Sequence, residues 1–417
     1  MTVLSSVCEL IIDCEHKTAP TATSGYPLIR TPDIGVGRLH VDRAQRVDEA
    51  TYHAWTKREV PRAGDLILAR EAPVGHVGIV PPGVHPVLGQ RTVLIRPRSQ
   101  VVDPYYLNYL LSGPDLRGWM TRTTTGATVS HLNMADIRAM PLPPLPSIKT
   151  QRKIAVVLSA YDNLIENNSR RIRILEEIAR RIYHEWFVAF RYPGHESVPL
   201  TGSELGLTPA GWPVVPFTDI ADVLSGGTPK TTEPGYWGGK IPFFTPRDAP
   251  NALVALRTEK RLTDEGVSRC NSQLYPEGTV FITARGTVGK VVMAGVPMAM
   301  NQSCYALRGI ELSQEYVVLS LLAQVAYLRA NTGGATFDTI IVDTFRRMAV
   351  VRPPVELVSA FTEDVRPVLQ AVKVTLRAID NLRSTRDLLL PRLVSGEIDI
   401  GDLDIPTGEA RALDIAG

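Results

Sequence analysis

The chain has 417 residues, of which 44% are hydrophobic, and this is enough for two or three domains with cores of their own. Its formal net charge is only +2, which permits nucleic-acid binding without indicating it, so any basic surface has to be local. The four cysteines form no CxxC pair, which argues against a zinc site or a disulfide framework and fits a reducing cytosol. No basic segment follows Met1 and no run of about 18 apolar residues occurs, so we expect a cytoplasmic protein without a secretory signal or a membrane span.

The sequence contains an internal repeat. Residues 64–70 lead to Gly75 in the same pattern in which residues 278–285 lead to Gly289. Three further pairs of segments repeat, namely 125–128 with 333–336, 143–144 with 353–354, and 162–164 with 380–382. Two copies of one unit, each a compact segment followed by a long helix, predict a pseudo-twofold molecule.

The first compact unit is predicted to cover residues 1–146. Short strand-like runs occur at residues 66–68, 77–80 and 93–95. Asp103 before Pro104 predicts the N-cap and the first residue of a helix. The unit ends in the proline-rich residues 140–146, which can continue neither a helix nor a central strand.

A long helix is predicted over residues 147–190. Apolar residues recur there at alternating steps of four and three, which is the heptad seam of a coiled coil. The seam positions are Ile154, Leu158, Tyr161, Ile165, Asn168, Ile172, Leu175, Ala179, Ile182 and Trp186. We expect Asn168 to fix the register of the helix pair at some cost in stability.

A second helix, predicted over residues 355–398, follows the same spacing. Its seam positions are Val358, Phe361, Val365, Val368, Val372, Thr375, Ile379, Leu382, Arg386, Leu389 and Leu393. Pro367 is expected to kink or restart this helix, and Gly396 to stop it. Because both helices occupy the same place in their repeats, an intramolecular coiled coil is favoured over two separate amphipathic helices that each pack on their own domain.

The rest of the chain divides at composition changes. Residues 191–211 are polar and contain proline and glycine, which predicts a linker. Residues 212–354 form the second compact unit, and the acidic residues 399–417 are expected to be a loosely held tail.

No segment supports a catalytic centre. Residues 103–106 lack the second proline of the Asn/Asp-Pro-Pro-Tyr/Phe motif of amino-methyltransferases, so a helix N-cap is favoured there. Residues 286–290 lack the spacing and the final Ser or Thr of a phosphate-binding loop, so a hairpin turn is favoured. The histidines are scattered, and His184-Glu185 lacks the second histidine of a zinc protease helix. We therefore expect no catalytic residue and no metal ligand.

One loop combines residue types that suit contacts with phosphates and base edges. Residues 226–232, followed by residues 236–239, mix glycines, hydroxyls, a lysine and two aromatic rings. The corresponding place in the first unit is residues 15–21. An ordinary surface loop explains this composition equally well.

Arginines and amides at strand ends are further candidates. Arg70 and Arg285 each end a strand-like run, and an arginine there can fork onto guanine or onto a phosphate. Gln90 and the pair Asn301 and Gln302 occupy matching places in the two repeats. Their amides can read adenine or merely satisfy a strand edge.

Motifs spread over nearly the whole chain match one known family. They are residues 225–230, 236–242 and 245–248 in the second unit, 151–155, 175–179 and 186–187 in the first long helix, and 386–398 at the end of the second. With these motifs the chain resembles the specificity subunit of Type I restriction–modification systems. The first unit departs from the pattern, since residues 14–18 contain no Gly-Gly-Thr-Pro.

The resemblance implies an α+β fold with two similar target-recognition domains, separated by two long antiparallel helices that form an intramolecular coiled coil. Each domain reads one half of a split, asymmetric sequence in double-stranded DNA. Two modification (methyltransferase) subunits and two restriction (motor and nuclease) subunits complete the complex, and these partners use S-adenosylmethionine, ATP and magnesium. The chain itself is expected to bind no cofactor and to catalyse nothing.

We expect the DNA contacts to come from Lys17, Thr18, Arg30, Arg70, Gln90, Thr228, Lys230, Thr231, Tyr236, Trp237, Arg247, Arg285, Lys290, Asn301 and Gln302. Two alternatives remain at this point. One is a fused modification–restriction polypeptide, whose methyl-donor motifs this sequence lacks. The other is a helical adaptor protein that does not read sequence.

Overall fold

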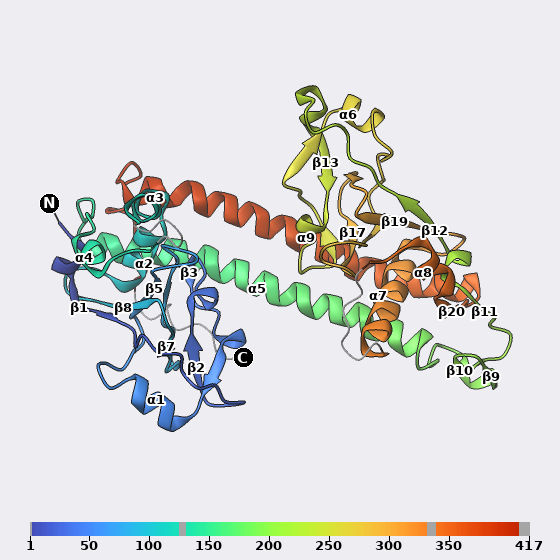
Figure 1. Cartoon of the computed structure of the whole chain (residues 1–417), viewed down its shortest axis with the longest axis horizontal. Coiled ribbons are helices and arrows are strands. Elements are labelled where there is room, and N and C mark those ends of the chain that lie inside the picture. The colour runs from blue at the N-terminus through green and yellow to red at the C-terminus, as the bar shows by residue number, and fades with distance from the viewer. Residues whose placement is uncertain (1, 125–130, 332–338, 408–417) are drawn as a thin grey trace. The chain divides into compact units, whose positions relative to one another are not determined.

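A computed structural model describes residues 2–124, 131–331 and 339–407 (Figure 1). The chain forms two compact units. The first unit holds residues 1–165 and 382–417, and the second unit holds residues 166–381. Two long helices, α5 (Ile148–Phe187) and α9 (Val355–Val394), contribute one part to each unit. The fold is α+β, as expected.

The first unit contains two β-sheets. Its strands are β1 (Cys8–Asp13), β2 (Tyr26–Ile29), β3 (Gly37–Arg38), β4 (Gln45–Val47), β5 (Leu66–Ala69), β6 (Val77–Ile79), β7 (Val87–Leu88) and β8 (Thr92–Pro97). One sheet has the order β1-β8-β5-β6-β3, in which only β3 and β6 run parallel. The other has the order β4-β2-β7, in which β2 is antiparallel to β4 and parallel to β7.

Helices α2 (Pro104–Ser112), α3 (Pro114–Thr123) and α4 (Met134–Ala139) cover one face of the larger sheet. Helix α1 (Glu49–Trp55) instead packs against the smaller sheet, where Tyr52 stacks on Tyr26 of β2. The Asp103 carboxylate accepts hydrogen bonds from the backbone N–H groups of Tyr105 and Tyr106, which confirms the predicted N-cap. Leu66 and Leu68 of β5 pack with α2, whereas Ile67 packs in a second cluster on the other face. Both faces of β5 are therefore buried, which explains its continuous apolar run.

The second unit repeats this architecture. Its strands are β9 (Leu200–Ser203), β10 (Gly206–Pro209), β11 (Val214–Pro216), β12 (Ala221–Ser225), β13 (Trp237–Phe244), β14 (Val254–Ala255), β15 (Lys260–Leu262), β16 (Val280–Thr283), β17 (Val291–Ala294), β18 (Ala299–Met300), β19 (Cys304–Gly309) and β20 (Ala349–Val351). Its helices are α6 (Asp264–Ser268), α7 (Gln314–Asn331) and α8 (Val342–Arg347).

The strand orders of the two units correspond one to one. The five-stranded sheet of the second unit is β12-β19-β16-β17-β14, with β14 and β17 parallel, and the three-stranded sheet is β15-β13-β18. The predicted repeat is thus confirmed at the level of topology. The expected hairpin at residues 286–290 is the turn between β16 and β17. The repeated segments 125–128 and 333–336 lie outside the described residues.

The predicted linker, residues 191–211, contains regular structure. Residues 200–209 form the β9–β10 hairpin, in which Thr201 pairs with Thr208. Tyr192 stacks on Trp212 with ring centroids 5.1 Å apart. The stacking ties the segment to Trp212 of the second unit, and the hairpin has no counterpart among the strands that the structure describes in the first unit.

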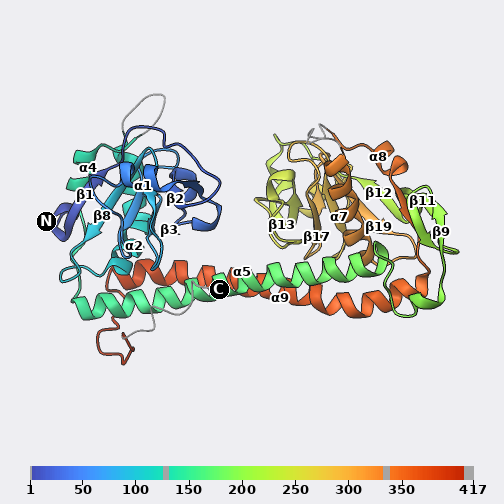
Figure 2. The same cartoon turned by 90° about the horizontal axis from the view of Figure 1, so that it is seen from below.

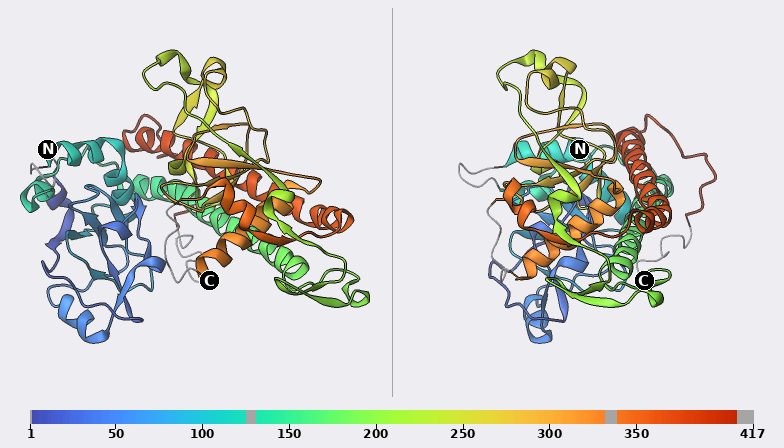
Figure 3. Two further views of the ribbon diagram at one scale, coloured as in Figure 1. Left: turned by 45° about the vertical axis from the view of Figure 1, so that its right-hand side comes forward. Right: turned by 90° about the vertical axis from the view of Figure 1, so that its right-hand side faces the viewer.

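Helices α5 and α9 lie side by side and antiparallel, as predicted for the coiled coil (Figures 2 and 3). In the first unit, Ile154 and Leu158 of α5 share a core with Leu393 of α9. In the second unit, the ring of Phe187 lies 4.9 Å from that of Phe361. The predicted restart at Pro367 is wrong because α9 is continuous from Val355 to Val394.

The predicted seam is largely buried. Its buried members include Ile154, Leu158, Ile165, Ile172, Ala179, Val365, Val372 and Ile379, whereas Leu175 and Leu382 are half-buried. Near the end of α5 the buried residues are Tyr183 and Phe187, not the predicted Ile182 and Trp186. Gly396, with φ +78°, follows the end of α9, as expected for a C-terminal stop.

The repeated Asp-Asn-Leu segments place a carboxylate at matching points of α5 and α9. In the first unit, Asp162 accepts hydrogen bonds from Arg386 Nη1 at 2.5 Å and from the Tyr109 hydroxyl at 2.6 Å. In the second unit, Asp380 pairs with Arg257 Nε at 2.8 Å. Both carboxylates therefore bind an arginine, but the arginines come from different elements.

The start of the tail is not loosely held, contrary to expectation. Ile400 is buried in the core of the first unit. The Lys153 ammonium of α5 donates hydrogen bonds to the carbonyl oxygens of Gly401 and Leu403, each at 2.6 Å. The prediction from the acidic composition of the tail gave no weight to Ile400, whose burial fixes the segment.

Candidate nucleic-acid interface

Strand register identifies which residues of the two units are equivalent. Ala69 of β5 lies opposite Thr92 of β8, and Thr283 of β16 lies opposite Cys304 of β19. The turn that enters β8 is thus equivalent to the turn that enters β19. Counting back from these strands pairs Gln90 with Gln302, so the two units carry the same amide at the same exposed position.

The same register corrects one expectation about the arginines. The backbone N–H of Arg70 donates to the carbonyl oxygen of Arg91 at 2.9 Å, and that of Ala284 donates to Ser303 at 2.8 Å. Arg70 is therefore equivalent to Ala284, and Arg285 is equivalent to Glu71. The two arginines predicted from the strand ends do not occupy matching positions.

Three segments of the second unit meet at one corner, which we call the β16–β19 corner. They are the loop after β12, the turn after β16 and the turn before β19. The Thr228 hydroxyl donates to the Gln302 side chain, and the backbone N–H of Arg285 lies 3.3 Å from the Ser303 carbonyl oxygen. The Asn301 side chain accepts from the Ser303 backbone N–H at 3.1 Å, so Asn301 shapes the turn.

Arg285 is an exposed cation of this corner. Its side chain is exposed and makes no hydrogen bond or ion pair with any residue that the structure describes. Gln302 is exposed beside it. A free guanidinium next to an amide can donate to base edges or to phosphates.

The aromatic part of the predicted loop is held in place by the fold. The Trp237 indole N–H donates to the Lys230 carbonyl oxygen at 3.2 Å, and its ring packs edge-on against Phe243. Lys260 Nζ lies 5.4 Å from the centroid of the Trp237 ring. Tyr236 is half-buried, whereas Lys230 and Thr231 are exposed. The exposed Lys230 side chain is therefore free to approach a nucleic acid.

Two further candidates flank a shared turn. In both units a carboxylate caps this turn: Asp33 accepts from the Arg30 backbone N–H at 3.0 Å, and Asp248 accepts from that of Thr245 at 2.9 Å. Arg247 is exposed in the second turn, whereas Arg30 Nε also contacts the Asp33 carboxylate at 3.4 Å. Elsewhere in the second unit, Lys290 is half-buried and its Nζ lies 3.5 Å from the Asn251 side-chain oxygen.

In the first unit, Lys17, Thr18 and Gln90 are exposed, but Arg70 is not. The Arg70 side chain is 14% exposed, with Nη1 lying 2.5 Å from an Asp13 carboxylate oxygen and Nε donating to the Leu132 carbonyl oxygen at 2.8 Å. Arg70 therefore fixes the end of β1. Arg91, which the sequence patterns did not indicate, is exposed in the turn before β8, at the place equivalent to the β16–β19 corner.

A sequence model of the Type I restriction modification DNA specificity domain matches residues 24–177 and again residues 209–357. The chain belongs to this family. It is 25% identical to the Type I restriction enzyme MjaIX specificity subunit of Methanocaldococcus jannaschii, over 88% of this chain and 84% of that protein. It is also 25% identical to the HindI specificity subunit of Haemophilus influenzae, over 75% of this chain and 81% of that protein.

The fold of the specificity subunit has a solved counterpart. The crystal structure of a Type I restriction–modification S subunit from M. genitalium superposes with a TM-score of 0.57 at 14% identity, covering 94% of this chain and 95% of that one. This likeness shows the shared fold. Within the described residues, none of the helices is both long and apolar enough to span a lipid bilayer.

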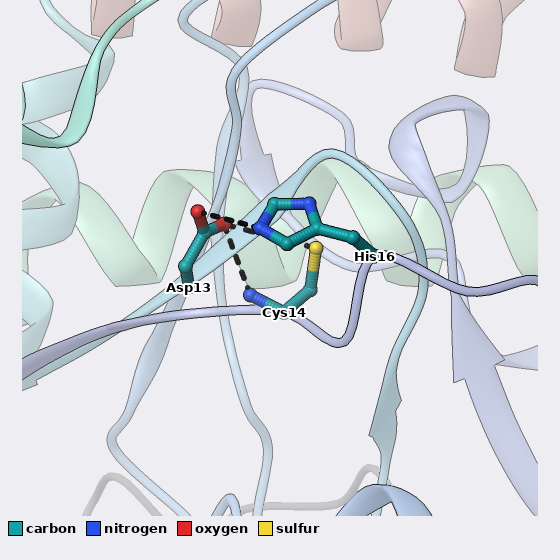
Figure 4. Close-up of side chains that lie close together, drawn as sticks. All are labelled: Asp13, Cys14 and His16. Atoms are coloured by element: carbon teal, nitrogen blue, oxygen red, sulfur yellow. Dashed lines mark hydrogen bonds and ion pairs between the residues drawn. The ribbon is translucent and has the colours of Figure 1, made fainter.

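The end of β1 and the loop after it also bring together three residue types that bind metals. The ligand atoms of Asp13, Cys14 and His16 all lie within 4.8 Å of one another (Figure 4). However, Arg70 already neutralises the Asp13 carboxylate, and His16 Nε2 lies 3.2 Å from the same oxygen. Burial raises the pKa of the Cys14 thiol, which disfavours the thiolate that a metal requires. This trio therefore fits a structural role rather than a metal centre.

Proposed function

We propose that this chain is the DNA-reading subunit of a Type I restriction–modification complex, and that each specificity domain reads one half of a bipartite, asymmetric target. One observation carries the proposal. The two units share a strand order and one exposed glutamine, Gln90 or Gln302, yet differ in the side chains around it. A common scaffold with different exposed donors suits two readers of different sequences.

The chemistry of the corners supports base and phosphate contacts. Arg285 can donate two hydrogen bonds to guanine, and the amides of Gln90 and Gln302 can pair with adenine. Exposed lysines such as Lys17 and Lys230 suit the phosphate backbone, which supplies affinity without sequence information. The net charge of +2 is small for a DNA-binding protein, so we infer that partner subunits share the electrostatic contacts.

We further propose that α5 and α9 carry two modification subunits, with two restriction subunits completing the complex. Large aliphatic side chains point to solvent on these helices: Leu164 and Leu388 in the first unit are 51% and 68% exposed, and Ile174 and Val374 in the second are 62% and 61% exposed. Docking of the modification subunits along α5 and α9 would bury these four side chains and leave the seam undisturbed.

In this proposal the chain is not itself an enzyme. S-adenosylmethionine, ATP and magnesium act in the partner subunits, where methyl transfer and DNA cleavage take place. The complex works on chromosomal and incoming DNA in the cytoplasm. The two family matches, and the similarity to a specificity subunit over 88% of this chain, favour this function over a fused polypeptide or an adaptor that does not read sequence.

The test is methylation by the assembled complex. The full chain is co-expressed with its modification subunits, and methylated positions are mapped across a genome that lacks other methyltransferases. We expect methylation at a single bipartite sequence. Exchanging residues 1–146 for the same segment of another family member should change one half of that sequence only. Methylation without sequence preference would overturn the proposal.

A further inference from the structure

We propose that Arg91 contacts the DNA target and is the counterpart, in the first specificity domain, of Arg285 in the second. The inference rests on the proposed function and adds to it a residue that the sequence patterns did not indicate. Arg91 lies directly after the exposed Gln90, in the turn that enters β8. Three observations support it: the free end of its guanidinium, its backbone conformation and its place in the repeat.

The guanidinium of Arg91 is held at one side and free at the other. Its side chain is 56% exposed, and its closest ionic contact joins Nε to the Glu71 Oε2 atom at 2.9 Å. Glu71 is itself only 21% exposed, so its carboxylate holds Arg91 Nε in a defined position. No described residue accepts a hydrogen bond from Arg91 Nη1 or Nη2, and these two groups form the fork that pairs with guanine or a phosphate. A supported arginine also loses less side-chain freedom on binding.

The backbone at Arg91 has a conformation that favours glycine. Its φ is +66°, in the left-handed region, where side chains with a Cβ are disfavoured. The turn is fixed on either side, since the Thr92 hydroxyl donates to the Gly89 carbonyl oxygen at 2.7 Å and Arg70 N–H donates to the Arg91 carbonyl oxygen. A long charged side chain at such a position indicates a use for that side chain, because glycine would make the same turn without strain.

Comparison with the second unit indicates a role for the Arg91 side chain. Arg91 is equivalent to Ser303, and Glu71 is equivalent to Arg285. In the second unit the backbones of Arg285 and Ser303 approach to 3.3 Å, so these two positions are neighbours at the corner. Each unit therefore has one exposed arginine at this pair of neighbouring positions. In the first unit the arginine is in the turn before β8, and in the second unit it is in the turn after β16. The guanidinium thus approaches DNA from a different strand end in each domain, which gives the two domains different reading geometries.

A plain surface ion pair between Arg91 and Glu71 is the competing explanation. Exposed ion pairs contribute little to stability, so this explanation gives no reason for an arginine at a left-handed position. It also predicts that removal of the Arg91 side chain changes nothing in DNA recognition. The two explanations therefore separate in a single experiment.

The experiment uses the complex of the full chain with its modification subunits. Single-turnover methylation is measured on the mapped target duplex and on duplexes in which each base pair is substituted in turn. The variants are Arg91→Ala and Arg91→Gly, the second of which removes the side chain and relieves the backbone. Arg62→Ala is the matched control, because Arg62 is 62% exposed in the same unit and pairs with Glu9 at 3.1 Å.

We expect both Arg91 variants to slow methylation of the target roughly 5- to 150-fold and to lose discrimination at a base pair of one half-site only. If Arg91 binds a phosphate, the loss is instead uniform over sequences and the salt dependence weakens by about one charge. Arg62→Ala should stay within about twofold of the wild-type rate, since an exposed ion pair contributes little.

Three results have distinct meanings. If the wild-type complex shows no sequence preference, the proposed function fails. If the wild-type complex reads a bipartite target but both Arg91 variants match it in rate, discrimination and salt dependence, only the inference about Arg91 is overturned. If both variants lower the thermal unfolding midpoint of the chain as strongly as loss of a buried ion pair does, Arg91 is structural and the inference is also overturned.

Discussion

Asp162 of α5 and Arg386 of α9 form an ion pair in which Oδ1 and Nη1 lie 2.5 Å apart. The other oxygen of Asp162 accepts the Tyr109 hydroxyl of α2 at 2.6 Å. Burial and the neighbouring carboxylate raise the pKa of Tyr109 well above its ordinary value, so the hydroxyl keeps the proton that it donates. One carboxylate thus joins both long helices to the domain of the first unit.

Replacing Asp162 with Ala should destabilise the first unit. The change leaves the partly buried Arg386 guanidinium without its main partner, and we expect a loss of about 1–3 kcal/mol in the free energy of unfolding. Urea denaturation followed by circular dichroism measures it. Asp387→Ala is the control, because Asp387 touches the same guanidinium but is 63% exposed. Equal effects of the two variants would contradict this account.

Arg70 and Arg285 should respond in opposite ways to replacement by Ala. Arg285 is exposed and free of partners among the described residues, so Arg285→Ala should weaken recognition of one half-site without lowering the melting temperature. Arg70 is 14% exposed and paired with Asp13, so Arg70→Ala should lower stability by about 2 kcal/mol or more. Calorimetry and methylation assays on both variants distinguish the roles. A large loss of stability in Arg285→Ala would show that it is structural.

Two valines of α9 lie on different sides of the helix, one in the seam and one on the outer surface. Val372 is fully buried, whereas Val374 is 61% exposed. Val372→Glu places a charge without a partner in the seam and should destabilise the chain by about 3 kcal/mol or more. Val374→Glu should leave the melting temperature unchanged but weaken co-purification with the modification subunits. Intact folding of the Val372 variant would count against the coiled-coil seam.

Glu176 should make stability depend on pH. It is 4% exposed and accepts the Leu253 backbone N–H at 2.5 Å, and burial raises its pKa above the ordinary 4.5. The Glu176 carboxyl therefore stays protonated to a higher pH in the folded chain than in the unfolded chain. This group's contribution to stability is greatest at acidic pH and falls as pH rises from about 4.5 through the raised pKa.

Glu176→Gln keeps an acceptor for Leu253 and removes the titration. We expect a flatter dependence of the unfolding midpoint on pH between 4.5 and neutrality, and equal or higher stability at neutral pH. The neighbouring Glu177, which is 52% exposed, supplies the control Glu177→Gln. A variant whose pH profile coincides with that of the wild type would show that Glu176 does not titrate in this range.

The start of the tail should contribute to stability. Ile400 is 5% exposed, and Ile400→Ala is expected to cost about 2–4 kcal/mol because it leaves a cavity in the core of the first unit. Leu403 is 54% exposed in the same segment, and Leu403→Ala should have an effect below about 0.5 kcal/mol. Thermal unfolding measures both. Similar values for the two would mean that the tail is not packed.

Features that depend on local sequence could be predicted. The Asp103 N-cap, the long helix from Ile148 and the apolar strand at Leu66 each have a signal within a few residues. The repeated strand could also be predicted, because residues 64–75 and 278–289 share the glycines of their turns. In contrast, the burial of Arg70 depends on Asp13 and on the carbonyl group of Leu132, which are remote in sequence.

Two errors have separate physical origins. A heptad pattern drifts relative to a helix of 3.6 residues per turn, so the buried face reached Tyr183 and Phe187 instead of Ile182 and Trp186 once a domain covered a second side of α5. The arginine expected at the strand end of the first unit lies one position away from the equivalent of Arg285. Arg91 carried no signal because only strand register reveals its neighbour Glu71.

The shared core of the first unit has a consequence for the order of folding during synthesis. Residues 382–405 complete this core, whereas the second unit is continuous from residue 166 to residue 381. On the ribosome, the first unit is made early but lacks Leu393 and Ile400 until the last part of the chain emerges. The second unit can close its core sooner, so the end of the chain that is synthesised first is the one that finishes folding last.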